Sequence, residues 1–164
     1  MTKLIQPQPL GFIDHQYDFS FSVNAKPNKV WDWLNNPATF IDNQIWPYKV
    51  EFYSPDPSTI PNGFNEGVLT VHFGPFINFA GVITSIKEDY RDLQYFHGSY
   101  ALGMRWIRPY RLQFWTEENE KGTDTLIKCR INYWVTVSIR PIWDWCQKQF
   151  WKTFPRFARK NIVS

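Results

Sequence analysis

The sequence predicts an α+β fold in which a curved antiparallel sheet of seven strands wraps around a long C-terminal helix. Two patterns lead to this prediction. Apolar and polar residues alternate in short runs up to residue 138, and one long amphipathic run follows over residues 140–162. An antiparallel sheet followed by a single long helix buries one face against that helix. A chain of 164 residues with 43% hydrophobic residues suits one such core.

The first quarter of the chain predicts an arm, a strand and two short helices. Residues 1–15 have no clear period and are expected to form an irregular arm, leaving a single domain over residues 16–164. Strict alternation then predicts a half-buried strand, with apolar positions at Tyr17, Phe19, Phe21 and Val23. Helical spacing follows over residues 27–34, and a second short helix is expected around residue 40.

Six further strands are expected before the long helix. Their patterns cover residues 48–52, 69–73, 76–87, 93–97, 106–115 and 126–137. In the second of these runs, Leu69 and Val71 are expected to face the core and His72 to face water. In the last run, Tyr133 shares the inward face with four aliphatic positions and Cys129.

The C-terminal helix carries an aromatic stripe. Trp143, Cys146, Phe150, Phe154 and Phe157 fall on one face, and basic residues fall on the other. Pro155 is expected to kink the helix about two-thirds of the way along. A curved sheet touches a straight helix along only part of its length, so a gap between them is the candidate site.

Composition and motifs exclude several classes of function. Six of the 18 basic residues lie in the last 25 positions, so a chain-wide nucleic-acid groove is not expected. Neither a nucleophile motif nor a glycine-rich phosphate loop occurs in the sequence, and no metal-ligand spacing is present, so no catalytic residue, cofactor or metal is expected. The two cysteines fit reduced core residues. Without a signal-like or membrane-spanning run, the sequence indicates a cytoplasmic protein.

The opening of the domain also resembles a known family. The alternating strand over residues 19–23 is followed by motif residues Ala25, Pro27, Val30, Trp31, Leu34, Asn36, Pro37 and Phe40. This series, together with the final strand and helix, resembles the START/Bet v 1-like (SRPBCC) superfamily with the helix-grip fold. Within that superfamily it is similar to the polyketide cyclase/dehydrase-like group. The resemblance implies a deep apolar cavity between sheet and C-terminal helix that holds lipids, polyketides or quinones, with no invariant catalytic set.

Alternation selects candidate ligand-binding residues in this cavity. On the strand over residues 106–115, the parity of Leu112 and Phe114 also turns Arg108 inward, where its guanidinium would bind an anionic ligand head. The alternative is a bulge near Pro109 that reverses the facing and leaves Arg108 in solvent. The predicted ligand-binding set is Tyr95, His97, Trp106, Arg108, Tyr110, Tyr133, Phe150 and Phe154.

The leading interpretation is binding, transport or sequestration of a hydrophobic small molecule. One alternative is an enzyme of the cyclase or dehydratase type that uses Tyr95, His97 or Arg108 as its polar groups. Another is a membrane-surface or protein-interaction module, in which a basic helix face meets an anionic surface through Trp145, Lys148, Lys152 and Arg156. A further alternative is that aromatic rings fill the cavity outright. The oligomeric state is left open.

Overall fold

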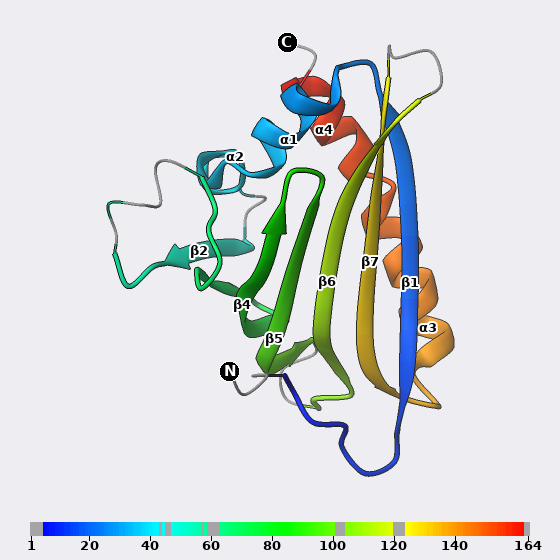
Figure 1. Cartoon of the computed structure of the whole chain (residues 1–164). Helices are drawn as coiled ribbons and strands as arrows, with labels where there is room; N and C mark the ends of the chain where they lie inside the picture. Colours follow the sequence, from blue (N-terminus) through cyan, green and yellow to red (C-terminus); the bar gives the residue numbers. More distant parts are fainter. Residues whose placement is uncertain are drawn as a thin grey trace.

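The computed structural model describes residues 5–42, 44, 47–56, 58, 63–100, 104–119 and 124–162. Within them, seven strands form one antiparallel sheet, two short helices follow the first strand, and a helix in two segments ends the chain (Figure 1). The predicted fold class is therefore confirmed. The elements are β1 Phe12–Val23, α1 Pro27–Leu34, α2 Pro37–Ile41, β2 Lys49–Tyr53, β3 Leu69–Gly74, β4 Ile77–Lys87, β5 Tyr90–Tyr100, β6 Ile107–Glu118, β7 Thr125–Thr136, α3 Arg140–Trp151 and α4 Phe154–Ile162.

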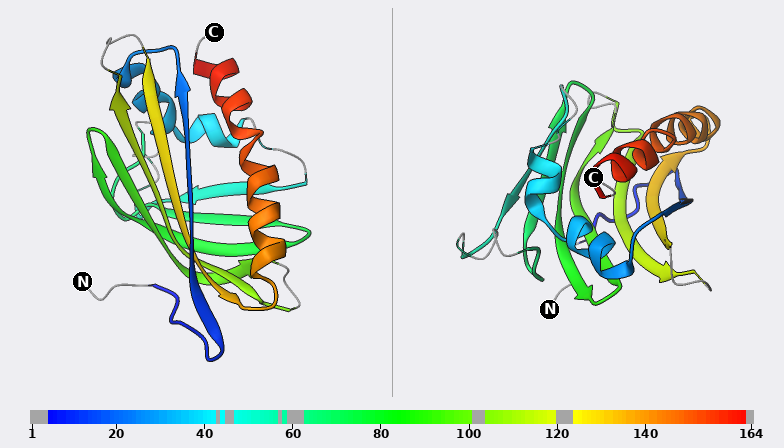
Figure 2. Two further views of the ribbon diagram at one scale, coloured as in Figure 1. Left: turned by 90° about the vertical axis from the view of Figure 1, so that its right-hand side faces the viewer. Right: turned by 90° about the horizontal axis from the view of Figure 1, so that it is seen from above.

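The strand order in the sheet is β1-β7-β6-β5-β4-β3-β2. Consecutive strands from β2 to β7 are neighbours, and the first strand closes the order beside the last. The sheet bends strongly, and α3 and α4 run along its concave side near β1 and β7 (Figure 2). The helix pair α1 and α2 covers one end of the same side. All four helices thus enclose one interior against the sheet.

The first strand begins earlier than predicted. It starts at Phe12, and residues 12–15 pair with β7, so the expected irregular arm over residues 1–15 is too long. The predicted facing of the strand is correct, because Phe21 and Val23 are buried and the alternate positions are exposed. His15, which the sequence placed in the arm, is buried opposite Tyr133 of β7.

The C-terminal helix is broken rather than kinked. Helix α3 ends at Trp151 and α4 begins at Phe154, with Lys152 and Thr153 between them. Pro155 has no N–H to donate, and its ring crowds the carbonyl group four residues earlier. Thr153 turns the chain at this point, since its backbone N–H and its hydroxyl both donate to the Phe150 carbonyl oxygen, at 3.1 and 2.6 Å.

Bulges interrupt the pleat in three strands, one of them at Thr84 of β4, where Ile83 pairs with Leu93 and Ser85 with Asp92. In β5, Tyr95 pairs with Gly81 and His97 with Ala80, which leaves Phe96 as an extra residue. In β6, the register with β7 shifts between Pro109 and Arg111. A bulge turns the following side chains to the opposite face of the sheet. The β5 bulge lies inside a segment where the sequence predicted uninterrupted alternation, and the β6 bulge is the alternative that the sequence analysis gave near Pro109.

Gln6 of the N-terminal arm lies at the bulges of β5 and β6. Regular pairing between β5 and β6 is interrupted between Gln94 and Tyr100. There the Gln6 backbone N–H donates to the Tyr95 carbonyl oxygen at 2.9 Å, and its side-chain Nε2 donates to the Pro109 carbonyl oxygen at 2.7 Å. Its own carbonyl accepts from Trp134 Nε1 at 2.9 Å. The arm thus supplies hydrogen bonds where the sheet has none of its own.

The interior contains two hydrophobic clusters. The larger one joins β1, β6 and β7 to α1, α3 and α4. The smaller one joins β4 and β5 to Phe64 and Val68, with partly buried Phe40 and Phe52 against it. Tyr100 and Leu112 contact both clusters. No described helix is long and apolar enough to cross a membrane.

Candidate ligand-binding interior

Three of the predicted site residues face the interior between the sheet and the helices. Tyr95 on β5 is 3% exposed and Tyr133 on β7 is fully buried. Phe154 opens α4 and packs its ring against Phe114 and Phe21, with centroids 6.3 and 5.8 Å apart. These residues come from three elements that are distant in the sequence. The sheet and the final helix bring them to one interior.

The inward facing predicted for His97 is wrong. His97 is exposed, whereas Leu93 and Tyr95 on the same strand are buried. The extra residue Phe96 in the bulge reverses the alternation between Tyr95 and His97.

Trp106, Arg108 and Tyr110 also lie outside the predicted cavity. Ile107 and Pro109 face the interior, so Arg108 points to the outer face, where its guanidinium lies over the Phe12 ring at 5.3 Å. Trp106 is 39% exposed. The bulge near Pro109, which the sequence analysis gave as the alternative, is present.

Tyr110 has partners on the outer face. Its hydroxyl donates to Asp14 Oδ1 at 2.8 Å, and its ring stacks on Trp134 with centroids 4.4 Å apart. These contacts fix Tyr110 on the side of the sheet opposite to Tyr133.

On the helix, Phe150 is 55% exposed, so its predicted inward position is also wrong. The face toward the sheet is formed instead by Trp143, Gln147 and Trp151, spaced four residues apart. The prediction that the opposite face is exposed is correct for Trp145, Lys148, Lys152 and Arg156.

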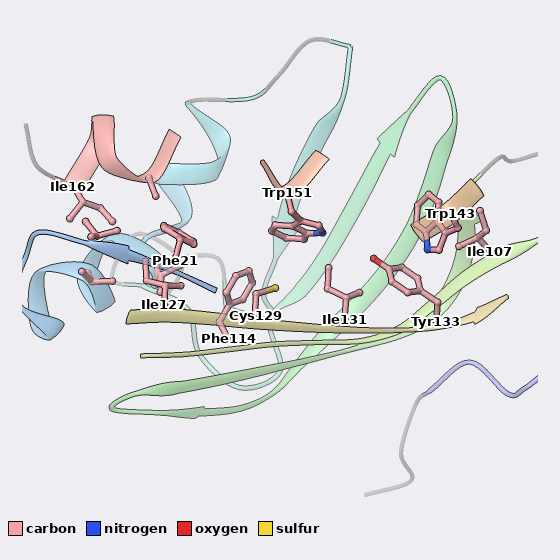
Figure 3. Close-up of a cluster of buried hydrophobic side chains, with 14 of the residues drawn as sticks. Phe21, Ile107, Phe114, Ile127, Cys129, Ile131, Tyr133, Trp143, Trp151 and Ile162 are labelled. Atoms are coloured by element: carbon pink, nitrogen blue, oxygen red, sulfur yellow. The ribbon is translucent and has the colours of Figure 1, made fainter. Parts of the chain in front are cut away.

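Under α3, side chains occupy the space where the sequence predicted a gap. Trp151 lies against Phe19 with ring centroids 5.6 Å apart. Trp143 lies between Tyr100 and Tyr133, with ring centroids at 4.6 and 5.3 Å. Figure 3 shows its ring beside that of Tyr133. Two hollows among the described residues lie elsewhere, and neither of them is lined by the C-terminal helix. One of about 500 Å³ lies beside α2 and β2, and one of about 270 Å³ lies over β1, β6 and β7.

Polar groups are nevertheless concentrated under α3. The Tyr133 hydroxyl donates to Gln147 Oε1 at 2.8 Å, and Trp151 Nε1 donates to the same oxygen at 3.0 Å. Trp143 Nε1 is buried without a hydrogen-bond partner among the described residues. His15 lies beside this group, with its Nε2 2.8 Å from Asp144 Oδ1 at an angle unsuited to a hydrogen bond.

Burial keeps the tyrosines of the interior protonated. Desolvation raises the pKa of Tyr95, Tyr100 and Tyr133 well above the ordinary value near 10. Their hydroxyls therefore remain hydrogen-bond donors at neutral pH. Those of Tyr95 and Tyr100 can orient an oxygen or nitrogen acceptor on a guest, whereas the single proton of Tyr133 is donated to Gln147, and all three are poor bases.

His72 is an interior residue that sequence reasoning placed in water. Thr70 of the same strand is buried, and the His72 ring stacks on Phe79 with centroids 4.7 Å apart. Its Nε2 lies 2.9 Å from Thr70 Oγ1. Desolvation lowers the pKa of His72 to about 4, so the imidazole is neutral at pH 7. The sequence did not indicate that this face of β3 is buried, because Thr70 and His72 are polar. Leu69 suggested the opposite facing because it is apolar, although it is exposed.

Arg91 is a second interior group that sequence reasoning missed. Its Nη1 donates to the Leu34 carbonyl oxygen at the end of α1, at 2.5 Å, and its guanidinium lies over the Phe64 ring at 4.8 Å. Burial lowers its pKa to about 10, so it stays charged at neutral pH. Arg91 shares the parity of Leu93 and Tyr95, which is the signal that could have found it. A cation at a helix C-terminus stabilises the helix, so Arg91 joins α1 to β5.

Partly buried aromatic rings gather where α1, α2 and α4 meet. We call Trp33, Phe40, Phe154 and Phe157 the aromatic rim. Trp33 contacts the other three, with centroid distances of 6.0, 6.1 and 5.4 Å. Trp33 Nε1 is buried without a hydrogen-bond partner among the described residues. The rim lies beside the break between α3 and α4.

Comparisons with known proteins identify the fold. No family model and no curated protein matches the sequence. Solved structures that match include norcoclaurine synthase from Thalictrum flavum in complex with dopamine and hydroxybenzaldehyde, at 12% identity over 94% of this chain and 89% of that one, with a TM-score of 0.66. A protein from Nitrosospira multiformis matches at 12% identity over 92% and 97%, with a TM-score of 0.67. Ara h 8.0201 matches at 11% identity over 92% and 98%, with a TM-score of 0.59.

These likenesses define the fold of the protein. Together with the strand order and the gripping helix, they show that the chain has the Bet v 1-like (SRPBCC-like) helix-grip fold, as its opening residues predicted. Its placement in the polyketide cyclase/dehydrase-like group stays a prediction.

Proposed function

We propose that this protein binds a hydrophobic small molecule, of the lipid, polyketide or quinone class, in the interior between the concave sheet and the C-terminal helix. The observation that carries the proposal is the aromatic rim. Four large rings that converge at one place and keep part of their surface in water favour an apolar guest that covers them. The buried, unpartnered N–H of Trp33 supplies one polar contact at that place.

The break in the C-terminal helix supports entry at the rim. Helices α3 and α4 are joined through Lys152 and Thr153, so α4 can pivot without unwinding α3. The first residue of α4, Phe154, is itself a member of the rim. A pivot of α4 would move its rings away from Trp33 and make room for the guest, in the way that side chains and short segments adjust to ligands in other proteins.

The interior favours binding over catalysis. A general base works best with a pKa near the working pH, and the interior groups lie far from it: the tyrosine pKa values are raised and that of His72 is about 4. The alternative of a cyclase or dehydratase retains Tyr95 but loses His97 and Arg108 as interior groups. Norcoclaurine synthase shows that the fold supports enzymes, and its complex holds small aromatic molecules.

Native mass spectrometry of protein purified from its own host, followed by solvent extraction, tests the proposal. We expect a bound lipid-like or aromatic molecule that is depleted in Phe157→Asp, which places a carboxylate in the rim. The matched control is Phe76→Asp, because Phe76 is an exposed phenylalanine outside the rim. Repeated recovery of empty protein, or equal occupancy in both variants, would contradict binding at the rim.

A second function is favoured by an exposed patch at the opposite end of the sheet. We define the end patch as Leu10, Met104, Trp106, Val137, Ile142 and Trp145, all exposed. They lie where β1 and β6 begin and β7 ends, since Phe12 pairs with Thr136 and the Thr136 N–H donates to the Trp106 carbonyl. Arg105, Arg108 and Arg140 belong to the same end.

Tryptophan and arginine beside exposed apolar side chains suit the surface of an anionic membrane. We propose that the end patch and the adjoining basic face at Lys148 and Lys152 make transient contact with such a surface. In flotation assays, vesicles with phosphatidylserine should carry the protein, and Trp145→Ala should reduce the bound fraction. Lys128→Ala on β7 is the control. Equal flotation with neutral vesicles, or no effect of Trp145→Ala, would exclude this contact.

Because both cysteines are free, we also propose a cytoplasmic location.

A further inference from the structure

Strand β2 has a strand neighbour on one side only among the described residues. The sheet order places β1 and β2 at the two edges of the sheet. Helices α3 and α4 run near β1 (Figure 2), and the Arg159 guanidinium donates to the Ser22 carbonyl oxygen of that strand at 3.2 Å. Beside β2 lies the hollow of about 500 Å³, which all five residues of the strand line. This hollow gives the β2 edge room for an added strand.

The backbone of Val50 faces the hollow. Its carbonyl oxygen accepts from Gln44 Nε2 at 3.0 Å, and Gln44 also lines the hollow. In an antiparallel ladder, the N–H and C=O of one residue point to the same side, and those of the next residue point to the other side. Val50 and Phe52 therefore present their N–H groups to the hollow, and the residues between and beside them bond β3.

The pairing of β3 with β4 leads to the same result. The Ile83 N–H of β4 donates to the carbonyl oxygen of the residue directly before β3, at 2.9 Å. In steps of two along this ladder, Thr70 and His72 also bond β4. These two residues lie opposite Phe52 and Val50 of β2. The backbone groups of Phe52 and Val50 are thus directed away from β3.

The side chains of β2 are complementary to those of a second β2 strand. Lys49 and Glu51 are exposed, carry opposite charges and lie on one face of the strand, on either side of Val50. When two copies pair antiparallel about Val50, Lys49 of each copy lies opposite Glu51 of the other. Tyr48, which is 38% exposed, then lies opposite Phe52. Cross-strand ion pairs and aromatic pairs stabilise a ladder, whereas pairing about Glu51 would place two carboxylates opposite each other.

We propose that two copies of this protein associate through β2, with the backbone of Val50 in one copy hydrogen-bonded to that of Val50 in the other. The two sheets then become continuous. A two-fold axis makes the contact self-complementary, because each ion pair and each aromatic pair occurs twice. Five residues form a small interface, so the dimer is weak and forms at high protein concentration. No residue of the aromatic rim takes part in the contact.

Analytical ultracentrifugation at protein concentrations from about 10 μM to about 1 mM measures this association. Wild-type protein should show a reversible equilibrium between monomer and dimer. Glu51→Lys and Lys49→Glu should each weaken the dimer at least about tenfold, because like charges then lie opposite each other twice. Combining Lys49→Glu with Glu51→Lys should restore the affinity to within about threefold. Glu88→Lys, the same charge change in the exposed turn between β4 and β5, should leave the dimer unchanged.

Amide hydrogen exchange followed by NMR gives a second readout on wild-type protein. The amides of Val50 and Phe52 should exchange more slowly as the protein concentration rises, whereas that of Glu51, already bonded to β3, should not change. Protein that stays monomeric up to about 1 mM would overturn the proposal. So would a dimer that Glu51→Lys and Lys49→Glu leave intact, because its contact would then lie on another surface.

Discussion

Because of His72, the stability of the protein should depend on pH between 6.5 and about 4. Replacing His72 should remove this dependence. The ring is packed against Phe79 and Tyr95 and is partly buried, and desolvation lowers its pKa from 6.5 to about 4. Above the unfolded pKa of 6.5 the imidazole is neutral in both states. Between 6.5 and about 4 the unfolded chain binds a proton that the folded protein refuses, so stability falls as the pH falls through this range.

The size of the effect follows from the shift. Each pKa unit corresponds to about 1.4 kcal/mol, so the full shift gives roughly 3 kcal/mol, and about 2 kcal/mol once the partial exposure of the ring is allowed for. Urea unfolding of wild type and His72→Gln, at several pH values from about 7 to about 4, measures it. Because other groups titrate alike in both proteins, their stability difference isolates His72. A difference independent of pH would refute the placement of His72 in the interior.

Three substitutions test the packing that positions the interior, each by urea unfolding. Gln6→Ala should lower the free energy of unfolding by about 1 to 3 kcal/mol, because the Pro109 carbonyl at the β6 bulge loses its donor; a loss below about 0.5 kcal/mol would show that the arm does not join the bulges. Gly98→Ala should cost more than about 3 kcal/mol, since a Cβ there would lie 2.0 Å from the Asn78 carbonyl oxygen and Gly98 has a φ of +106°; near-neutral behaviour would contradict the bulge geometry. Gln147→Leu should cost about 2 to 4 kcal/mol, because two buried aromatic donors lose their shared acceptor; wild-type stability would mean that this network adds nothing.

Strands without irregularities were predictable from alternation alone. The facing of β1 and β7 follows directly from the sequence: Phe21 and Val23 are buried in β1, and Ile131 and Tyr133 are buried in β7. The order of elements was also predictable, because hairpin-linked strands and one long amphipathic run leave few arrangements. Val137 lies one residue beyond β7 and is exposed, which marks where the alternation ceases to apply.

The candidate site was harder to predict because the alternation of apolar and polar residues does not by itself show where a bulge adds a single residue. The extra residue in β5 moved His97 outward, and the shift in β6 did the same for Arg108. Gly98, at a positive φ, and Pro109 are the sequence signals of these irregularities. On the helix, the sequence analysis placed Phe150 on the buried face because it is hydrophobic, but Phe150 is exposed. The buried face is centred on Gln147, a polar residue that is buried because Tyr133 and Trp151 bind it.

We expect a hydrophobic guest to enter at the aromatic rim and to lie between the sheet and the C-terminal helix. Intermolecular nuclear Overhauser effects between the protein and a bound aromatic probe, 1-ethylnaphthalene, measure where the guest lies. We predict contacts from the naphthalene protons to the rings of Trp33, Phe154 and Phe157. Contacts confined to Phe52 and Tyr53, which line the hollow beside α2 and β2, would contradict it.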